Sequence, residues 1–342
     1  MVWVQDHDLR PHPAIPVLCL SALIGAAVPA ASAQTLPDYG FDWATVTDVG
    51  NRDTNATEAP LFDGHSVGGV NYTYRISKTE MTAGQWFEFV NAYTPYYDGN
   101  PGLTTFKGQW IGYDSINGTH YLNPAAENFA TVVNWRLAAR YCNWLHNGKV
   151  NEQWAFESGA YDTSTFGVDE NNDLTDQRER SPGAKFWIPS LDEWVKAMYW
   201  DPAKDNGEGE ELGGYWKYPT SSDEVPVSGV PGVGETSAGT RTVFDVGSYT
   251  DVTSPWGLFD GSGGEREWLE TLTAGNTFRM LAGTDYLSSA DSIALTDRID
   301  KVDAASVLFA SGTLRIAGIV PSPGTSVLVA AGAVFFARRR RD

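Results

Sequence analysis

Apolar residues recur at helical spacing in three segments of the chain, and a helix-capping residue precedes each segment. The expected caps are Thr82, Asn134 and Ser190. Gln85 and Glu193 stand three residues after the first and third caps, which is the spacing of a capping box. The pattern therefore predicts three short helices that begin just after residues 82, 134 and 190.

Short alternating runs predict strands elsewhere, at residues 71–78, 242–246 and 313–316. Gly, Pro, Asn and Asp dominate three long connections, at residues 98–123, 159–183 and 205–240. Short helices and short antiparallel strands among long loops predict an α+β fold class with one compact, loop-rich domain. Loops of this length are often functional or stabilised by ions.

Both ends of the chain have the pattern of sorting elements. An apolar run within residues 1–33 ends in Ala31-Ser32-Ala33, which is typical of a cleaved secretory signal. Residues 319–342 contain a Pro-rich hinge, an apolar stretch at 327–337 and four consecutive arginines. That stretch is shorter than the roughly 20 residues that span a bilayer. The sequence thus predicts an exported chain with one domain at residues 34–318, whose core covers about 70–317.

The C-terminal segment resembles a PEP-CTERM sorting signal, although Ser322 stands where that motif usually has Glu. The resemblance implies recognition by exosortase-type sorting machinery. It also implies a place in the envelope, on the surface or in the extracellular matrix of a bacterium. Contact with the membrane is then expected through this segment alone, either transient or stable. A plain tail anchor is the alternative.

The charge between these end segments is strongly negative. Residues 34–320 contain 19 basic and 40 acidic residues, a net charge of −21. Such a surface repels nucleic acid and anionic membranes, so no nucleic-acid partner is expected. It tolerates bound cations. Cys19 lies in the signal segment, so Cys142 has no partner for an intramolecular disulfide in the exported domain.

Residues 255–270, PWGLFDGSGGEREWLE, combine four glycines with flanking carboxylates. Glycine-rich backbone with carboxylates beside it can wrap around a hard cation. The simpler interpretation is that Asp260 caps a turn and Glu267 pairs with Arg266 or Arg279.

Five blocks of sequence, taken in order, resemble the formylglycine-generating enzyme (sulfatase-modifying factor) family. The blocks are YRISKTEMT at 74–82, VVNWRLAARYCNWL at 132–145, FWIPSLDEW at 186–194, GLFD through EW at 257–268, and LRIA at 314–317. The resemblance implies a compact relative of the C-type lectin fold. It also implies a copper-dependent oxidase that converts a sulfatase cysteine to formylglycine.

The chain departs from that family where the reaction takes place. Active members carry a redox cysteine pair after the block that corresponds to residues 279–286, and no cysteine follows that block here. Thiolates are the ligands that select copper(I), and a thiol is also the group that undergoes the redox chemistry of this reaction. Because this cysteine pair is absent, copper is not expected. Cys142 lies on the apolar face of the second expected helix, where we expect a buried structural thiol.

The same resemblance assigns a calcium ion to the glycine-rich loop. Asp260 and Glu267 are expected to give side-chain oxygens, and Gly263 and Glu265 backbone carbonyls. Calcium takes six to eight oxygens, so water completes the shell. An iron site built from His65, His120 and His146 is not expected, because the three are far apart in sequence and are interpreted as solvent-facing loop residues.

Aromatic residues in polar loops give a further hypothesis, which is stacking on a sugar ring. They are Trp110, Tyr113, Tyr121, Trp216 and Tyr218, with burial in the core as the alternative. The sequence as a whole favours a non-catalytic, calcium-stabilised binding or structural module of the envelope or its exopolysaccharide. The question of an enzyme stays open, with a formylglycine-generating oxidoreductase acting on a protein cysteine, or another residual oxidase, as the alternative.

Overall fold

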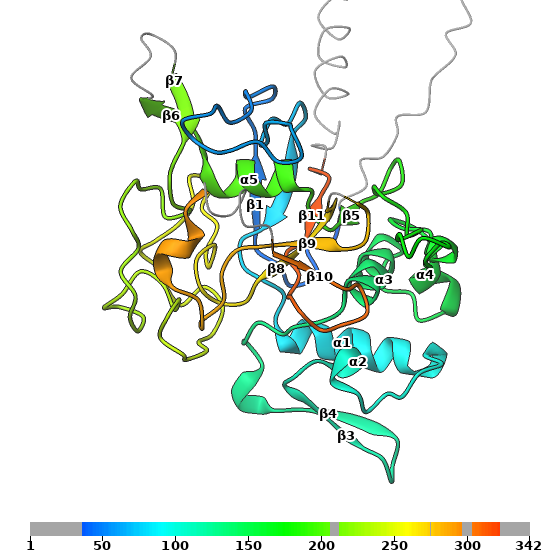
Figure 1. Ribbon diagram of the computed structural model, residues 1–342. Helices are drawn as coiled ribbons and strands as arrows, with labels where there is room; N and C mark the ends of the chain where they lie inside the picture. The colour runs from blue at the N-terminus through cyan, green and yellow to red at the C-terminus, as the bar shows by residue number, and fades with distance from the viewer. Residues whose placement is uncertain (1–35, 206–211, 274, 296–302, 322–342) are drawn as a thin grey trace, which may run out of the picture. The chain divides into compact units, whose positions relative to one another are not determined.

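The computed structural model describes residues 36–205, 212–273, 275–295 and 303–321 (Figure 1). The expected signal segment and the apolar C-terminal stretch lie outside these residues. Within them, no helix is both long enough and apolar enough to cross a membrane. Short helices and short antiparallel strands make up the fold, as predicted for an α+β domain.

The three expected helices are present with the expected caps. They are α1 (Ala83–Tyr93), α3 (Trp135–His146) and α5 (Leu191–Tyr199), capped by Thr82, Asn134 and Ser190. Both predicted capping boxes form, so the local sequence alone determines where α1 and α5 begin. Two short helices, α2 (Thr104–Lys107) and α4 (Gln153–Glu157), were not predicted.

The strands form two small sheets and two hairpins, all antiparallel. One sheet has the order β1-β2-β11-β5, from β1 (Trp43–Val46), β2 (Tyr74–Ser77), β11 (Ala317–Gly318) and β5 (Phe186–Trp187). The other has the order β10-β9-β8, from β10 (Asp303–Ala305), β9 (Arg279–Ala282) and β8 (Glu267–Leu272). The hairpins pair β3 (Ile111–Asp114) with β4 (Thr119–Leu122), and β6 (Trp200–Asp205) with β7 (Leu212–Tyr215).

Two of the strand predictions were wrong. Residues 242–246 make one isolated bridge, between Phe129 and Asp245, and no strand. Residues 313–316 run between β8 and β2 without forming a continuous ladder with either. The Thr313 amide donates to the Arg266 carbonyl on one side, and the Ser77 amide donates to the Ile316 carbonyl on the other. The strand in this region is β11, which begins at residue 317.

The core is rich in aromatic side chains, mainly where α1 meets α3. Trp86 and Phe89 of α1 contact Tyr141 of α3, and Phe89 also contacts Trp144 and Phe156 edge to face. Edge-to-face pairs add to the stabilisation that burial alone gives. Trp135 of α3 joins this core to β8 by donating to the Leu269 carbonyl at 3.0 Å.

Candidate functional site

Glu267, at the start of β8, is held by a buried arginine. Arg315 donates from Nε and Nη2 to both carboxylate oxygens of Glu267 at 2.8–3.0 Å, and both side chains are buried. The indole of Trp194 donates to Oε2 of Glu267 at 2.7 Å. Glu267 therefore pairs neither with Arg266 nor with Arg279. Arg315, in the block that closes the family pattern, is its partner.

Two further carboxylates lie beside this pair. Oδ2 of Asp260 accepts the Gly247 amide at 2.5 Å, and Oε1 of Glu80 accepts the Glu265 amide at 2.8 Å. Burial raises the pKa of Asp260 to about 6. Burial, together with the charges of Asp260 and Glu267, raises the pKa of Glu80 well above its ordinary value. Three carboxylates, those of Glu80, Asp260 and Glu267, thus lie near the single guanidinium of Arg315. Glu80 was not predicted from the sequence as part of this site.

The chemistry of this cluster fits a hard cation, because it combines oxygen donors with negative charge that Arg315 offsets only in part. Within the described residues, no three His, Cys, Asp or Glu side chains are arranged to hold a metal ion. A cation would therefore need backbone carbonyls, which the expected ligands Gly263 and Glu265 would supply. The set Asp260, Gly263, Glu265 and Glu267 stays a prediction.

The side chain of Glu265 points to a different neighbourhood. Its Oε1 accepts from Gln109 at 3.2 Å. Burial, followed by the charge of Asp285, raises the pKa of Glu265 to about 7. The predicted calcium ligand at this position is the backbone carbonyl of Glu265, so the place of its side chain does not affect the prediction.

Cys142 is fully buried in α3, as expected from its place on the apolar face. Burial raises the pKa of this thiol well above its ordinary value. A thiol in this setting is an inert packing residue, because the thiolate is the reactive form.

A large cleft of about 990 Å³ lies elsewhere, between α5, the end of β8 and the segment before β5. Its lining is mostly polar and includes Tyr72, Arg178, Glu179, Arg180, Asp192 and Glu270. The volume is at the upper end of the range for small-molecule and short-polymer sites.

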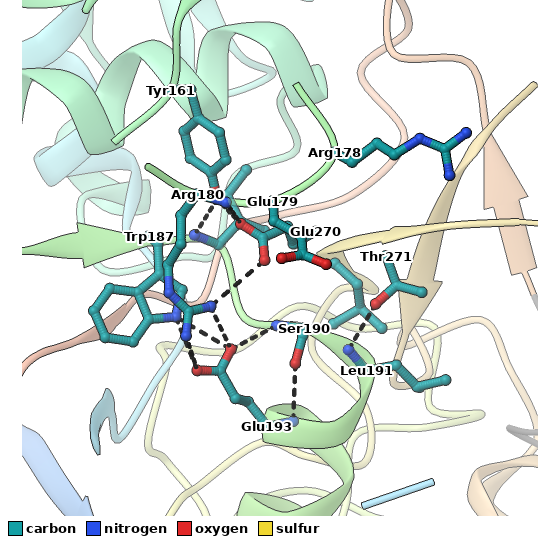
Figure 2. Close-up of polar contacts among 12 residues, drawn as sticks. Tyr161, Arg178, Glu179, Arg180, Trp187, Ser190, Leu191, Glu193, Glu270 and Thr271 are labelled. Carbon is teal, nitrogen blue, oxygen red and sulfur yellow. Dashed lines mark hydrogen bonds and ion pairs between the residues drawn. The ribbon is translucent and has the colours of Figure 1, made fainter. Parts of the chain in front are cut away.

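Arg180 organises the cleft by bridging two buried carboxylates (Figure 2). Its guanidinium contacts Glu193 at 3.1 and 3.3 Å and Glu270 at 3.5 Å. The guanidinium also stacks on the ring of Trp187, with 4.1 Å between its carbon and the ring centroid. The indole of Trp187 donates to both oxygens of Glu193. Glu193, the capping-box residue of α5, therefore also holds Arg180 and Trp187 in the wall of the cleft.

Glu270 is the titratable group at the base of this network. Its Oε1 accepts from the Tyr161 hydroxyl at 2.8 Å and from the Arg180 amide at 2.7 Å. Burial raises the pKa of Glu270 to about 7, and Arg180 opposes that rise. Sequence reasoning had missed this cleft, because Tyr72, Arg180 and Glu270 come from distant segments without a shared motif.

The other sequence-predicted residues are scattered. His120 is buried in β4, and His146 is half-buried at the end of α3, where it accepts the Lys185 amide. The prediction of solvent-facing loop histidines was therefore wrong for both, whereas His65 is exposed. Tyr218 is buried, whereas Tyr121 is 60% exposed. The expected aromatic residues belong to two separate hairpin regions, β3–β4 and β6–β7, and none lines the large cleft.

Comparison with known proteins identifies the family. Residues 49–306 match the family described as "Sulfatase-modifying factor enzyme 1-like domain". The solved "Crystal Structure of CarF" is 16% identical, covers 83% of this chain and 99% of its own, and has a TM-score of 0.45. The "Structure of PvdO from Pseudomonas aeruginosa" is 15% identical, covers 82% and 92% of the two chains, and has a TM-score of 0.34.

The comparison with curated proteins gives no match. The family match nevertheless spans most of the chain, and it includes the helices α1, α3 and α5 as well as the glycine-rich loop. This protein belongs to the sulfatase-modifying factor enzyme 1-like family.

Proposed function

We propose that this protein is an exported, non-catalytic binding module built on the sulfatase-modifying factor fold. The observation that carries the proposal is the state of Cys142, which is the sole cysteine between residues 34 and 320 and is fully buried. A formylglycine-generating oxidation needs an accessible, ionisable thiol pair. The exported domain offers neither.

The segment after β9 supports the same conclusion, because its side chains are engaged in holding the structure. The Thr284 hydroxyl accepts the Gly263 amide, and Asp285 pairs with Arg266 at 3.3 Å. No side chain in this segment is a nucleophilic thiol. Its role here is to brace the glycine-rich loop.

Binding is supported by the cleft around Arg180. Its walls are fixed by the Glu193 and Glu270 contacts, so a ligand would meet a preformed surface and cost little ordering entropy. Envelope polymers or exopolysaccharide are the partners proposed for an exported chain, delivered through exosortase-type sorting of the C-terminal segment.

Calcium is a second part of the proposal. Of the ligands predicted from the sequence, Asp260 and the backbone carbonyls of Gly263 and Glu265 would hold the ion. Glu80 would take the place expected for Glu267, because Arg315 occupies both oxygens of Glu267. The chemistry that calcium supplies is charge compensation and loop rigidity. Copper has no place in this proposal.

The test separates binding from oxidation. The full chain is incubated with copper, oxygen, reductant and a Cys-x-Pro-x-Arg peptide, and aldehyde formation is followed by mass spectrometry. We expect no aldehyde. Aldehyde formation that is lost in Cys142→Ala would reject the non-catalytic proposal. A thiol reagent should label Cys142 only after the protein is unfolded.

A further inference from the structure

Two hollows adjoin on the surface and share one wall. The large cleft and a second hollow of about 280 Å³ are both lined by Tyr72, Ser190 and Asp192. Together they form a groove that continues past Tyr72 on both sides. We propose that this groove binds a linear glycan of neutral or amino sugars across Tyr72, an inference that rests on the proposed binding function.

Tyr72 is a fixed aromatic platform. Its hydroxyl donates to Oε1 of Glu193 at 2.9 Å and accepts from Nη2 of Arg180 at 2.8 Å. Tyr74 packs against its ring edge to face, with 6.1 Å between the centroids. The residue is still 38% exposed. A ring that is both held and exposed can stack on the apolar C–H face of a sugar with little loss of side-chain entropy.

Polar groups that can bond to sugar hydroxyls flank this platform. Oδ1 of Asp192 accepts the Gly68 amide at 2.9 Å, and the structure gives its Oδ2 no partner among the described residues. Asn71 lines the second hollow and Asn276 the large cleft. Carboxylate and amide groups supply both acceptors and donors for the hydroxyls of consecutive sugars.

The charge of the groove selects the kind of glycan. Asp63, Glu179 and Asp192 line it, and Arg180 is already neutralised by Glu193 and Glu270. Arg178 is the one remaining lining guanidinium without a partner among the described residues. Carboxylates therefore exceed free cations, which repels a polyuronate, admits a neutral chain and attracts protonated amino sugars.

The experiment compares three hexasaccharides: a neutral glucan, a glucosamine oligomer and a polygalacturonate oligomer. Their binding to the full chain is measured by calorimetry at low and physiological salt. We expect the neutral and glucosamine oligomers to bind and the galacturonate oligomer to bind at least tenfold more weakly. Binding of the glucosamine oligomer should weaken with added salt.

Variants locate the site. Tyr72→Ala should weaken binding at least tenfold, whereas Tyr72→Phe keeps the ring and should weaken it less. Tyr121→Ala is the matched control, because Tyr121 is also an exposed tyrosine but lies on β4, away from the groove. Asp192→Asn should reduce the preference for the glucosamine oligomer over the neutral one. Melting curves confirm that each variant is folded.

Three results would overturn the inference: no binding of any probe, equal binding of the galacturonate oligomer, or unchanged binding in folded Tyr72→Ala. If glycan still binds in folded Tyr72→Ala, the ligand site lies elsewhere and the proposed binding function stands. If aldehyde forms in the oxidation assay, the proposed function fails whatever the groove binds. The two failures are therefore distinguishable.

Discussion

Three buried glutamates of this protein are compensated to different degrees by their partners. Glu267 has a bidentate arginine of its own, and Glu193 has Arg180 with an indole and a backbone amide. Glu270 shares Arg180 with Glu193 at a longer distance, and its pKa rises to about 7. The shared and longer contact with Arg180 therefore offsets the burial of Glu270 only in part.

We predict that Glu270 makes the protein less stable as pH rises. The folded state holds a proton on Glu270 up to about pH 7, whereas the unfolded chain releases it near pH 4. The folded state therefore binds more protons in this window, and stability falls from about pH 4 to about pH 7. By this argument Glu270→Gln should reduce the change in unfolding free energy across this pH window by roughly 3–4 kcal/mol at most.

The measurement is chemical denaturation from pH 4 to pH 8 in the presence of a chelator. Glu179→Gln is the control, since Glu179 lines the same cleft but is exposed. The unfolding free energy of Glu270→Gln should still fall to some extent as pH rises, because burial also raises the pKa of Asp260 to about 6 and that of Glu265 to about 7. The prediction is contradicted if the unfolding free energy of Glu270→Gln depends on pH as strongly as that of the parent protein.

At the scale of elements, the sequence predicts what local chemistry determines. The starts of α1, α3 and α5 follow from side chains within three residues of the cap. The β3–β4 hairpin also carries a local signal, the Asn117-Gly118 turn with positive φ at Gly118, although the composition of residues 98–123 favours a loop there. The cleft carried no such signal, because the Tyr72–Arg180 contact joins residues 108 positions apart.

The glycine-rich loop gives a prediction at this scale. Gly264 has φ +65°, and a Cβ placed there would lie 2.4 Å from Oε1 of Glu80. Gly264→Ala should therefore add a clash with a buried carboxylate to the strain of left-handed backbone. The expected loss of unfolding free energy is about 2–4 kcal/mol.

Gly257→Ala is the matched control in the same loop. Gly257 has φ +80°, but nothing lies within 4 Å of its added Cβ, so only the backbone strain of about 1 kcal/mol is expected. Denaturant titration of both variants isolates the contribution of the contact with Glu80. Equal losses in the two variants would show that Glu80 does not pack against Gly264.

At the scale of the whole molecule, a net charge of −21 on residues 34–320 opposes the compact state through self-repulsion. Part of that charge is concentrated where Glu80, Asp260 and Glu267 meet one arginine. A bound cation would relieve both the local and the global repulsion. Stability should then depend on calcium more than on ionic strength, because screening by salt acts weakly on buried groups.

We predict that chelation lowers the melting temperature of the full chain. A ligand present at 100 times its Kd stabilises by about 2.7 kcal/mol, which for a domain of this size corresponds to roughly 4–5 °C. Asp260→Asn should remove the response, since it takes away a charged ligand without breaking an ion pair. Glu267→Gln is less suitable because it would leave Arg315 buried without its partner.

Asp63→Asn is the control, because it changes an exposed carboxylate in the large cleft and should respond to chelator like the parent. A melting temperature that chelator does not move, in parent and variants alike, would reject the calcium site.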